Sequence, residues 1–305
     1  MLRPAAEPTA PFTPDFFIVG APKCGTTALA SVLSRHPDVR FCRYKEPHFF
    51  CTDLNWQIVK TERDYAALFD LGDDPASARA KLCGEASVFY LLSRTAIPAI
   101  EARGSAPRYI VLLRQPAKLI RSLYLENRKA GDEQHRSLAA AWHASLGHDA
   151  SAHRNPAAMR YADVGRLGEQ LERLYATVPR ERVHVIFHED LLRAPLQVYA
   201  DTLQFLGLPH DGRERFPIEN ESRDYHSSRY NRGITLISDL LGPHFRYRTS
   251  LRHVARALRF FNQKVVPVTD TDDAAIDTVI TEYFAPDIRR LGRLLDRNVD
   301  DWLVA

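Results

Sequence analysis

The stretch DFFIVGAPKCGTTALASVLSRHPDVRFCRYKEPHFF, residues 15–50, decides the fold of this chain. Residues 16–19 form a short apolar run that is typical of a buried strand. The chain then turns at residues 20–22, and an apolar-periodic segment follows that predicts a helix ending at His36-Pro37. A strand, a glycine-bearing loop and a helix start in this order place backbone N–H groups and the positive end of a helix dipole around an anion.

The side chains of the loop are also suited to binding an anion. Lys23 adds a mobile cation, and Thr26 and Thr27 add hydroxyl donors. The spacing of Gly20 and Gly25 matches that of a nucleotide-binding P-loop, but that motif places its lysine directly after the second glycine. The sequence therefore predicts a P-loop-like anion site with its lysine displaced, formed by Lys23, Cys24, Gly25, Thr26 and Thr27.

Two segments of this stretch resemble a known family, the PAPS-dependent sulfotransferases. The loop resembles their 5′-phosphosulfate loop, Pro-x-x-Gly-Thr-Thr with a Lys or Arg after the proline. Residues 45–50, KEPHFF, resemble the Lys-Glu-x-His-Phe-Phe segment of the heparan sulfate-type and related bacterial members. The resemblance covers roughly residues 15–209. It implies transfer of a sulfuryl group from PAPS (3′-phosphoadenosine 5′-phosphosulfate), with PAP as the product and no metal required.

The rest of the chain alternates between strand and helix patterns. Further strands are expected at residues 39–41, 81–87, 108–113 and 182–187. Helices are expected at residues 62–69, 93–103, 117–129, 137–146, 161–177, 196–206 and 274–295, the last as one helix or a pair, with a helical patch at 251–261. This alternation predicts a single α/β domain whose mainly parallel central sheet is flanked by helices.

The domain is expected to run from residue 15 to residue 305. Residues 1–14, rich in proline and alanine, are expected to be a disordered lead-in. Residues 71–75 are expected to form a loop, and residues 147–156 are expected to form a polar loop. The arginine-rich residues 211–268 are expected to be an irregular basic region that could cover the site.

Arg114 ends a buried strand, and Ser122 follows eight residues later on the next predicted helix. Ligands of open α/β sheets bind at the carboxyl ends of the strands, so a cation there commonly faces the site. The pair resembles the 3′-phosphate-binding pair of the family. The alternative is that Arg114 forms only a surface salt bridge.

Glu46 and His48 are the candidate residues for proton transfer. Sulfuryl transfer to a hydroxyl needs a general base, and a carboxylate or an imidazole can serve. The family's heparan sulfate 3-O-sulfotransferases use the glutamate of this segment, which implies that Glu46 is the base and that Lys23 and His48 assist. The alternative is that Glu46 pairs with Lys45 or Arg43 in a solvated turn.

The segment Gly84-Glu85-Ala86-Ser87, completed by Tyr90, resembles Gly-Glu-x-Ser-x-x-Tyr of bacterial relatives. Glu85 is the rival candidate for the base, and Glu85, Ser87 and Tyr90 are candidate acceptor contacts. The heparan sulfate 3-O-sulfotransferases carry a lysine near position 86 and an arginine at the position of Thr27, so specificity for a carbohydrate polymer does not transfer. Tyr161 and Arg166 are further possible ligand contacts.

The composition limits the partners. The net charge of +3 over 305 residues is too small by itself to imply nucleic acid. No apolar run is long enough for a membrane span. The four cysteines lack zinc or CxxC spacing, which favours a reducing compartment and a cytoplasmic protein. The expected acceptor is a small molecule or a carbohydrate.

The main alternative function is that of a P-loop kinase or NTPase that uses Mg²⁺. It needs an acidic residue after a buried strand to hold the metal, and Glu189-Asp190 follow the strand at 182–187. The strand at 108–113 instead ends in Arg114, which repels a metal ion. The lysine is also missing from its expected place in the loop.

Overall fold

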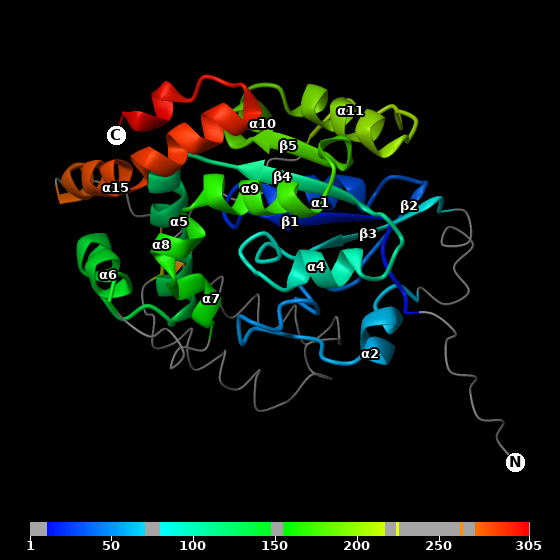
Figure 1. Ribbon diagram of the computed structural model, residues 1–305, viewed down its shortest axis with the longest axis horizontal. Helices are drawn as coiled ribbons and strands as arrows, with labels where there is room; N and C mark the ends of the chain where they lie inside the picture. Colours follow the sequence, from blue (N-terminus) through cyan, green and yellow to red (C-terminus); the bar gives the residue numbers. More distant parts are fainter. Residues whose placement is uncertain are drawn as a thin grey trace, which may run out of the picture.

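Five parallel strands form the central sheet in the part of the chain that the computed structural model describes, namely residues 11–70, 80–147, 155–216, 224–225, 263–264 and 272–304 (Figure 1). The strands are β1 (Phe16–Gly20), β2 (Val39–Phe41), β3 (Leu82–Ala86), β4 (Arg108–Leu113) and β5 (Val183–Phe187). Their order is β2-β3-β1-β4-β5, and every pairing in this sheet is parallel. The expectation of a mainly parallel sheet is confirmed.

The middle of the sheet is buried on both faces because its strands are apolar. All residues of β1 and all of β4 except Arg108 are buried. Gly84 of β3 lies directly against the ring of Phe16, and a Cβ at this position would come within 2.2 Å of Phe16 Cζ. A larger residue at position 84 would therefore displace the ring of Phe16 in the core.

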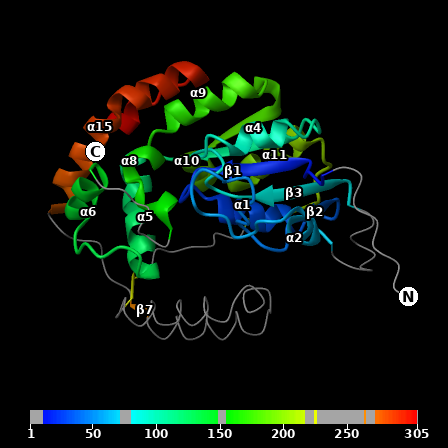
Figure 2. The same ribbon diagram turned by 60° about the horizontal axis from the view of Figure 1, so that its bottom comes forward.

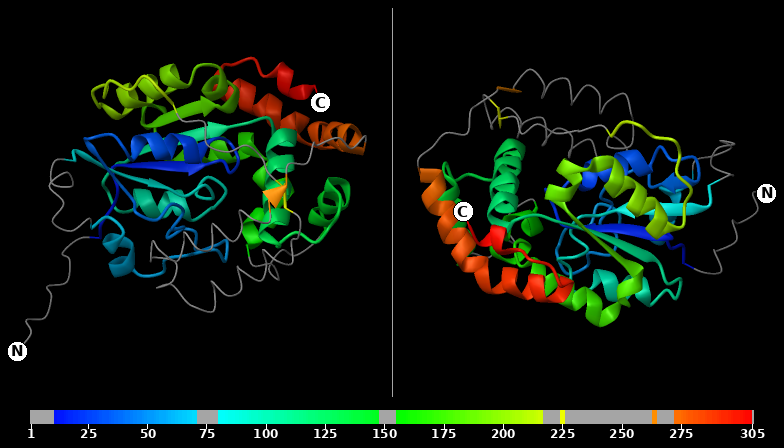
Figure 3. Two further views of the ribbon diagram at one scale, coloured as in Figure 1. Left: turned by 180° about the vertical axis from the view of Figure 1, so that it is seen from behind. Right: turned by 90° about the horizontal axis from the view of Figure 1, so that it is seen from above.

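Helices cover both faces of the sheet. Figure 2 shows α1 on one face and α4 and α9 on the other, and the right view of Figure 3 shows α11, in yellow-green, on the side of α1. The helices described are α1 (Thr26–Leu33), α2 (Glu62–Ala67), α4 (Ala96–Glu101), α5 (Pro116–Ala130), α6 (Leu138–Ser145), α7 (Pro156–Met159), α8 (Tyr161–Val164), α9 (Leu167–Thr177), α10 (His188–Arg193), α11 (Pro195–Leu206) and α15 (Asp272–Leu295), with 3₁₀ turns η2 (Arg180–Arg182) and η3 (Asp300–Leu303).

The connections after β1 and β4 leave these neighbouring strands in opposite directions along the sheet, toward β2 and β5. Such a reversal opens a crevice outside the carboxyl ends of the strands, where ligands of α/β sheets bind. The loop at residues 21–25 and Arg114 both lie at this reversal. The topology thus brings the two predicted anion-binding segments to one edge.

The predicted helix at residues 161–177 is interrupted, which corrects that expectation. It is divided into α8 and α9 at Gly165-Arg166. A Cβ at Gly165 would lie 2.3 Å from Phe284 Cζ, so α15 packs directly against the break.

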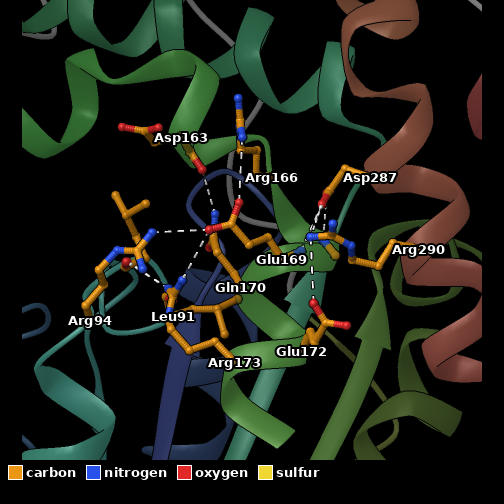
Figure 4. A network of polar contacts seen from close by, with 12 residues as sticks. Leu91, Arg94, Asp163, Arg166, Glu169, Gln170, Glu172, Arg173, Asp287 and Arg290 are labelled. Carbon is orange, nitrogen blue, oxygen red and sulfur yellow. Dashed lines mark hydrogen bonds and ion pairs between the residues drawn. The ribbon is translucent and has the colours of Figure 1, made fainter. Parts of the chain in front are cut away.

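Side chains of α9 and α15 satisfy the backbone at this break, as Figure 4 shows. Gln170 Nε2, on α9, donates to the carbonyls of Asp163 and Val164, at 2.8 and 3.1 Å. The carboxylate of Asp287, on α15, accepts from the backbone N–H groups of Gly168 and Glu169 at 2.7 and 2.9 Å. The interruption is therefore stabilised both by a local side chain and by one that is distant in the sequence.

The last described residues close against the edge of the sheet near β4 and β5. Gln115 Nε2 donates to the carbonyls of Trp302 and Val304 at 3.2 and 2.8 Å, and the ring of Trp302 packs on Phe187. α15 is a single helix that contains Pro286, so the expected helix or helix pair is one helix.

Several expectations fall outside the described residues. These are residues 1–10 of the lead-in at 1–14, the whole loop at 71–75, most of the loop at 147–156, and the helical patch at 251–261. The region 211–268 is described at residues 211–216 and in the two-stranded antiparallel pair of β6 (Asp224–Tyr225) with β7 (Gln263–Lys264). Within the described ranges, no helix combines the length and apolar character that a membrane crossing requires.

Candidate active site

A cavity of about 570 Å³ lies at the carboxyl edge of the sheet. Its lining includes residues that the sequence analysis assigned to donor and base, namely Lys23, Gly25, Thr26, Thr27, Glu46, Arg114 and Ser122. These residues come from three separate segments of the chain: the loop into α1, the stretch after β2, and the end of β4 with α5. The fold therefore places the predicted donor and base residues around one space.

The loop after β1 depends on a glycine where it enters α1. Gly25 has φ 93°, in the left-handed region, and a Cβ there would lie 2.6 Å from Leu191 Cδ2. The backbone of Lys23 also has a positive φ, 62°. This geometry turns the chain sharply into α1, so the first turn of the helix faces the cavity at Thr26 and Thr27.

Arg114 connects the end of β4 to this loop. Its Nη1 donates to the carbonyl of Lys23 at 3.1 Å, while its buried Nε has no hydrogen-bond partner. Burial lowers the pKa of Arg114 from its ordinary value. Ser122 lines the same cavity from α5. A buried guanidinium N–H without a partner is available to an anionic ligand.

Glu126 is a cavity residue that the sequence analysis missed. It lies one turn after Ser122 on α5, and its Oε2 is 3.6 Å from the ammonium of Lys23. The side chain of Lys23 is 30% exposed and that of Glu126 is 48% exposed. Spacing of four residues on a helix predicts a shared face, so Ser122 itself was the signal that could have identified Glu126.

Glu46 and His48 lie on one turn with unusual backbone geometry. Among the described residues six non-glycine residues have a positive φ, and they include Lys23, Glu46 (70°) and His48 (49°). Such conformations cost energy and concentrate at functional sites. Glu46 Oε1 lies 2.5 Å from Lys45 Nζ, and its Oε2 lies 3.5 Å from His48 Nε2.

The two side chains of this turn differ in exposure. The side chain of Glu46 is 35% exposed and lines the cavity, whereas the ring of His48 is fully buried and its two nitrogens have no hydrogen-bond partner. Burial opposes ionisation of Glu46, but the charge of Lys45 and the contact with His48 outweigh it and hold the pKa of Glu46 well below its ordinary value. Glu46 is therefore a carboxylate at neutral pH.

The family model described as "Sulfotransferase domain" matches residues 13–231, which include every lining residue of this cavity. The chain belongs to the sulfotransferase domain family.

Curated relatives and a solved structure agree with this membership. Carbohydrate sulfotransferase 15 of Mus musculus is 31% identical over 170 residues, which cover 42% of this chain and 30% of that protein. The Homo sapiens protein of the same name is 32% identical over 170 residues, with the same coverage. The match thus spans less than a third of the length of these relatives.

The crystal structure of a sulfotransferase from Alicyclobacillus acidocaldarius is similar to almost the whole chain. It is 26% identical, has a TM-score of 0.67, and the alignment covers 95% of this chain and 99% of that chain. The likeness therefore extends over nearly the whole chain.

In this sulfotransferase-family chain, β3 and the segment after it hold the turn of Glu46 and His48. Four backbone N–H groups between residues 42 and 50 donate to them: Cys42 to Gly84 O (2.9 Å), Glu46 to Ala86 O (2.8 Å), His48 to Ser87 Oγ (3.0 Å) and Phe50 to Tyr90 Oη (3.4 Å). Ser87 and Tyr90 are both buried. Their placement favours support of the base over direct contact with an acceptor.

Glu85 lies in the core behind the cavity. It is fully buried, and its Oε2 accepts from the hydroxyls of Tyr65 and Tyr90 at 2.7 and 3.0 Å, while its Oε1 has no hydrogen-bond partner. Burial raises the pKa of Glu85 to about 7, although these hydroxyls lower it and the nearby charge of Glu46 raises it further. Glu85 does not line the cavity, in contrast to Glu46.

Cys24, in the loop at residues 21–25, and His188, on α10, differ in their access to the cavity. Cys24 is fully buried and its thiol donates to the Pro22 carbonyl at 3.3 Å, so its side chain lies in the core. Burial raises the pKa of the Cys24 thiol, which stays protonated. His188, which the sequence analysis did not single out, lines the cavity at the start of α10. Burial, then the charges of Arg114 and Lys118, lower the pKa of His188 to about 4.

Tyr161 and Arg166 are not part of this cavity. Tyr161 is fully buried and donates to Glu133 Oε2 at 3.0 Å. Arg166 donates to Tyr283 Oη at 2.8 Å and lines a second cavity of about 560 Å³ between α6, α8 and α15. Neither contacts the space that Lys23 and Glu46 share.

Of the two residues expected to hold a metal in the alternative function, Asp190 is occupied by arginines, whereas Oε2 of Glu189 is buried without a hydrogen-bond partner. Asp190 accepts from Arg193 at 2.6 Å and from Arg297 at 2.7 Å. Glu189 lies close enough to Arg114 for their charges to interact. Within the described part of the chain, no cluster of three or more histidine, cysteine or acidic residues is arranged to hold a metal ion.

Proposed function

We propose that this protein transfers a sulfuryl group from PAPS to a hydroxyl or amine of an acceptor, in line and with Glu46 as general base. The observation that carries the proposal is the convergence of Lys23, Glu46 and Arg114 on one cavity. A cationic loop, a buried arginine and an ionised carboxylate are the groups that donor binding and proton removal need.

The donor fits the loop side of the cavity. The 5′-phosphosulfate would be held by the N–H groups and hydroxyls at Gly25, Thr26 and Thr27, at the positive end of α1. Arg114 and Ser122 would hold the 3′-phosphate, because Arg114 Nε is a buried donor without a partner. Cys24 would contribute through its backbone.

The reaction then follows from the placement of the charged groups. Glu46 takes the proton of the acceptor hydroxyl while the acceptor oxygen forms a bond to sulfur. The bond between sulfur and the phosphate oxygen breaks, and its electron pair stays on the leaving PAP. Lys23 stabilises the negative charge that develops on that oxygen. Sulfuryl transfer carries less charge than phosphoryl transfer, so we expect these cations to suffice without a metal.

The acceptor class is taken from the relatives, which are named carbohydrate sulfotransferases. A carbohydrate or another small hydroxylated molecule would bind on the side of Glu46, beside Val88 and Phe89. A cytoplasmic location remains our expectation from the cysteines, all four of which are free and buried.

Nucleotide binding separates this proposal from the alternative of a kinase. Isothermal titration calorimetry should show that PAP binds in the presence of EDTA and that ATP with Mg²⁺ binds far more weakly. Tighter binding of ATP with Mg²⁺ would instead favour the kinase, although both oxygens of Asp190 are held by arginines.

A further inference from the structure

Glu126 brings a negative charge into a cavity whose cations are otherwise suited to an anion. It extends from α5 into the space lined by Lys23 and Arg114, and nearly half of its side chain is exposed. A carboxylate at this position repels the phosphates of a nucleotide. Its presence therefore needs a physical reason other than donor binding.

The contact with Lys23 provides that reason. The ammonium of Lys23 lies 3.6 Å from Glu126 Oε2. The backbone of Lys23 is held in place, because its carbonyl accepts from Arg114 and the neighbouring Gly25 packs against Leu191. Only the side chain of Lys23 is free to exchange one anionic partner for another.

Glu126 also has a second cation within reach. Lys129 Nζ lies 3.8 Å from the same Oε2, at i+3 on α5. When Lys23 turns toward a phosphosulfate, the carboxylate keeps Lys129 as its counter-ion. The exchange therefore leaves no charge without a partner, which keeps its energetic cost small.

We infer that Glu126 is a positioning residue that holds Lys23 in the donor-free enzyme and recaptures it once the sulfuryl group has left. The inference rests on the proposed function, because it requires that Lys23 contacts the donor. When Lys23 returns to Glu126, the affinity of the cavity for PAP falls. Glu126 therefore accelerates product release, a step that limits turnover in many enzymes.

The test is a double-mutant cycle on PAP affinity, measured by calorimetry with the wild type, Glu126→Gln, Lys23→Ala and the double variant. Glu126→Gln should bind PAP about two- to fivefold more tightly, as expected for the loss of an exposed ion pair and of repulsion. The same substitution should have a smaller effect in the Lys23→Ala background, where it relieves repulsion only. Stopped-flow measurement should show slower PAP release from Glu126→Gln than from the wild type.

Glu172→Gln is the matched control, because it removes one exposed carboxylate from α9, outside the cavity. Its PAP affinity should equal that of the wild type. Equal tightening by Glu126→Gln in both backgrounds, or no tightening, overturns the inference while leaving the proposed function intact. Failure of the wild type to bind PAP overturns both.

Discussion

His48 Nε2 lies 3.5 Å from Glu46 Oε2, on the side of the carboxylate that is turned away from Lys45. The histidine ring is fully buried whereas the carboxylate reaches the cavity. Pro47 separates the two residues, and both have positive φ, so they form one fixed turn. A carboxylate at the cavity wall is thus backed by an imidazole in the core.

This arrangement predicts unequal roles for the three candidate residues. Glu46→Gln should keep the fold and PAP affinity but lower kcat by roughly 10²–10⁴-fold, the usual range for loss of a general base. His48→Ala should cost less, because the ring only supports the carboxylate. The three variants Glu46→Gln, His48→Ala and Glu85→Gln are compared with one acceptor, and a mildest effect for Glu46→Gln would mean that the base is misassigned.

The lowered pKa of Glu46 predicts the acid side of the pH profile. A depressed pKa keeps the carboxylate ionised as the pH falls through the ordinary glutamate value of about 4.3. The kcat of the wild type should therefore show no loss from protonation of Glu46 above that pH. An essential base that titrates near pH 6 would point to another group.

Removal of the loop cation should affect turnover more than binding. Lys23→Ala should lower kcat on the order of 10²-fold, because the charge that Lys23 stabilises grows in the transition state. PAP affinity should fall less. Lys81→Ala is the control, since that lysine pairs with Asp38 away from the cavity. Near-normal turnover of Lys23→Ala would refute the role.

Discrimination between PAP and ADP tests Arg114. A charge-assisted contact with the 3′-phosphate is worth about 1.5–3 kcal/mol, so the wild type should bind PAP at least tenfold more tightly than ADP. Arg114→Ala should lose most of this difference. Calorimetry with both nucleotides measures it, and equal affinities in the wild type would contradict the assignment.

Glu85 predicts a pH dependence of stability. Burial raises its pKa from 4.5 to about 7, so the folded state binds this proton more tightly than the unfolded state. The proton on Glu85 therefore adds about 3 kcal/mol to the free energy of unfolding. This contribution is fully present below about pH 4.5 and is lost as the pH rises through about 7. Glu85→Gln should remove this slope.

The free energy of unfolding is measured by chemical denaturation at pH 5 and pH 8, for both the wild type and Glu85→Gln. The decisive quantity is the difference between the two proteins in how the free energy of unfolding changes with pH. His188, whose pKa is lowered, contributes a change of the opposite sign, but it does so equally in both proteins. An unchanged slope in Glu85→Gln would show that Glu85 does not carry the proton.

Local pattern was sufficient for most of the fold. The apolar runs of β1 and β4 and the glycine loop before α1 are encoded by neighbouring residues, so their position followed from sequence alone. The break between α8 and α9 could not be predicted, because Asp287 and Phe284, which stabilise it, lie on α15. Such tertiary contacts leave no trace in the periodicity of residues 161–177.

The placement of three candidate residues followed from the sequence, whereas their roles stay predictions. Lys23, Arg114 and Glu46 line one cavity because each follows a parallel strand, and these strands end at the same edge of the sheet. Glu126 and His188 were missed although both left a signal in the sequence: Glu126 lies one turn after Ser122, and His188 directly follows β5. The burial of Glu85, in contrast, depends on Tyr65, which comes from α2 and is distant in the sequence.

The contact between Gln115 and Trp302 has a consequence for biosynthesis. Gln115 follows Arg114 directly, and its partners lie 187 and 189 residues further along the chain. During translation the contacts of Gln115 are therefore incomplete until residues 302–304 have left the ribosome. A nascent chain that already contains the glycine loop, Glu46 and Arg114 would still lack these contacts, so we expect nucleotide binding to mature only after residues 302–304 have emerged.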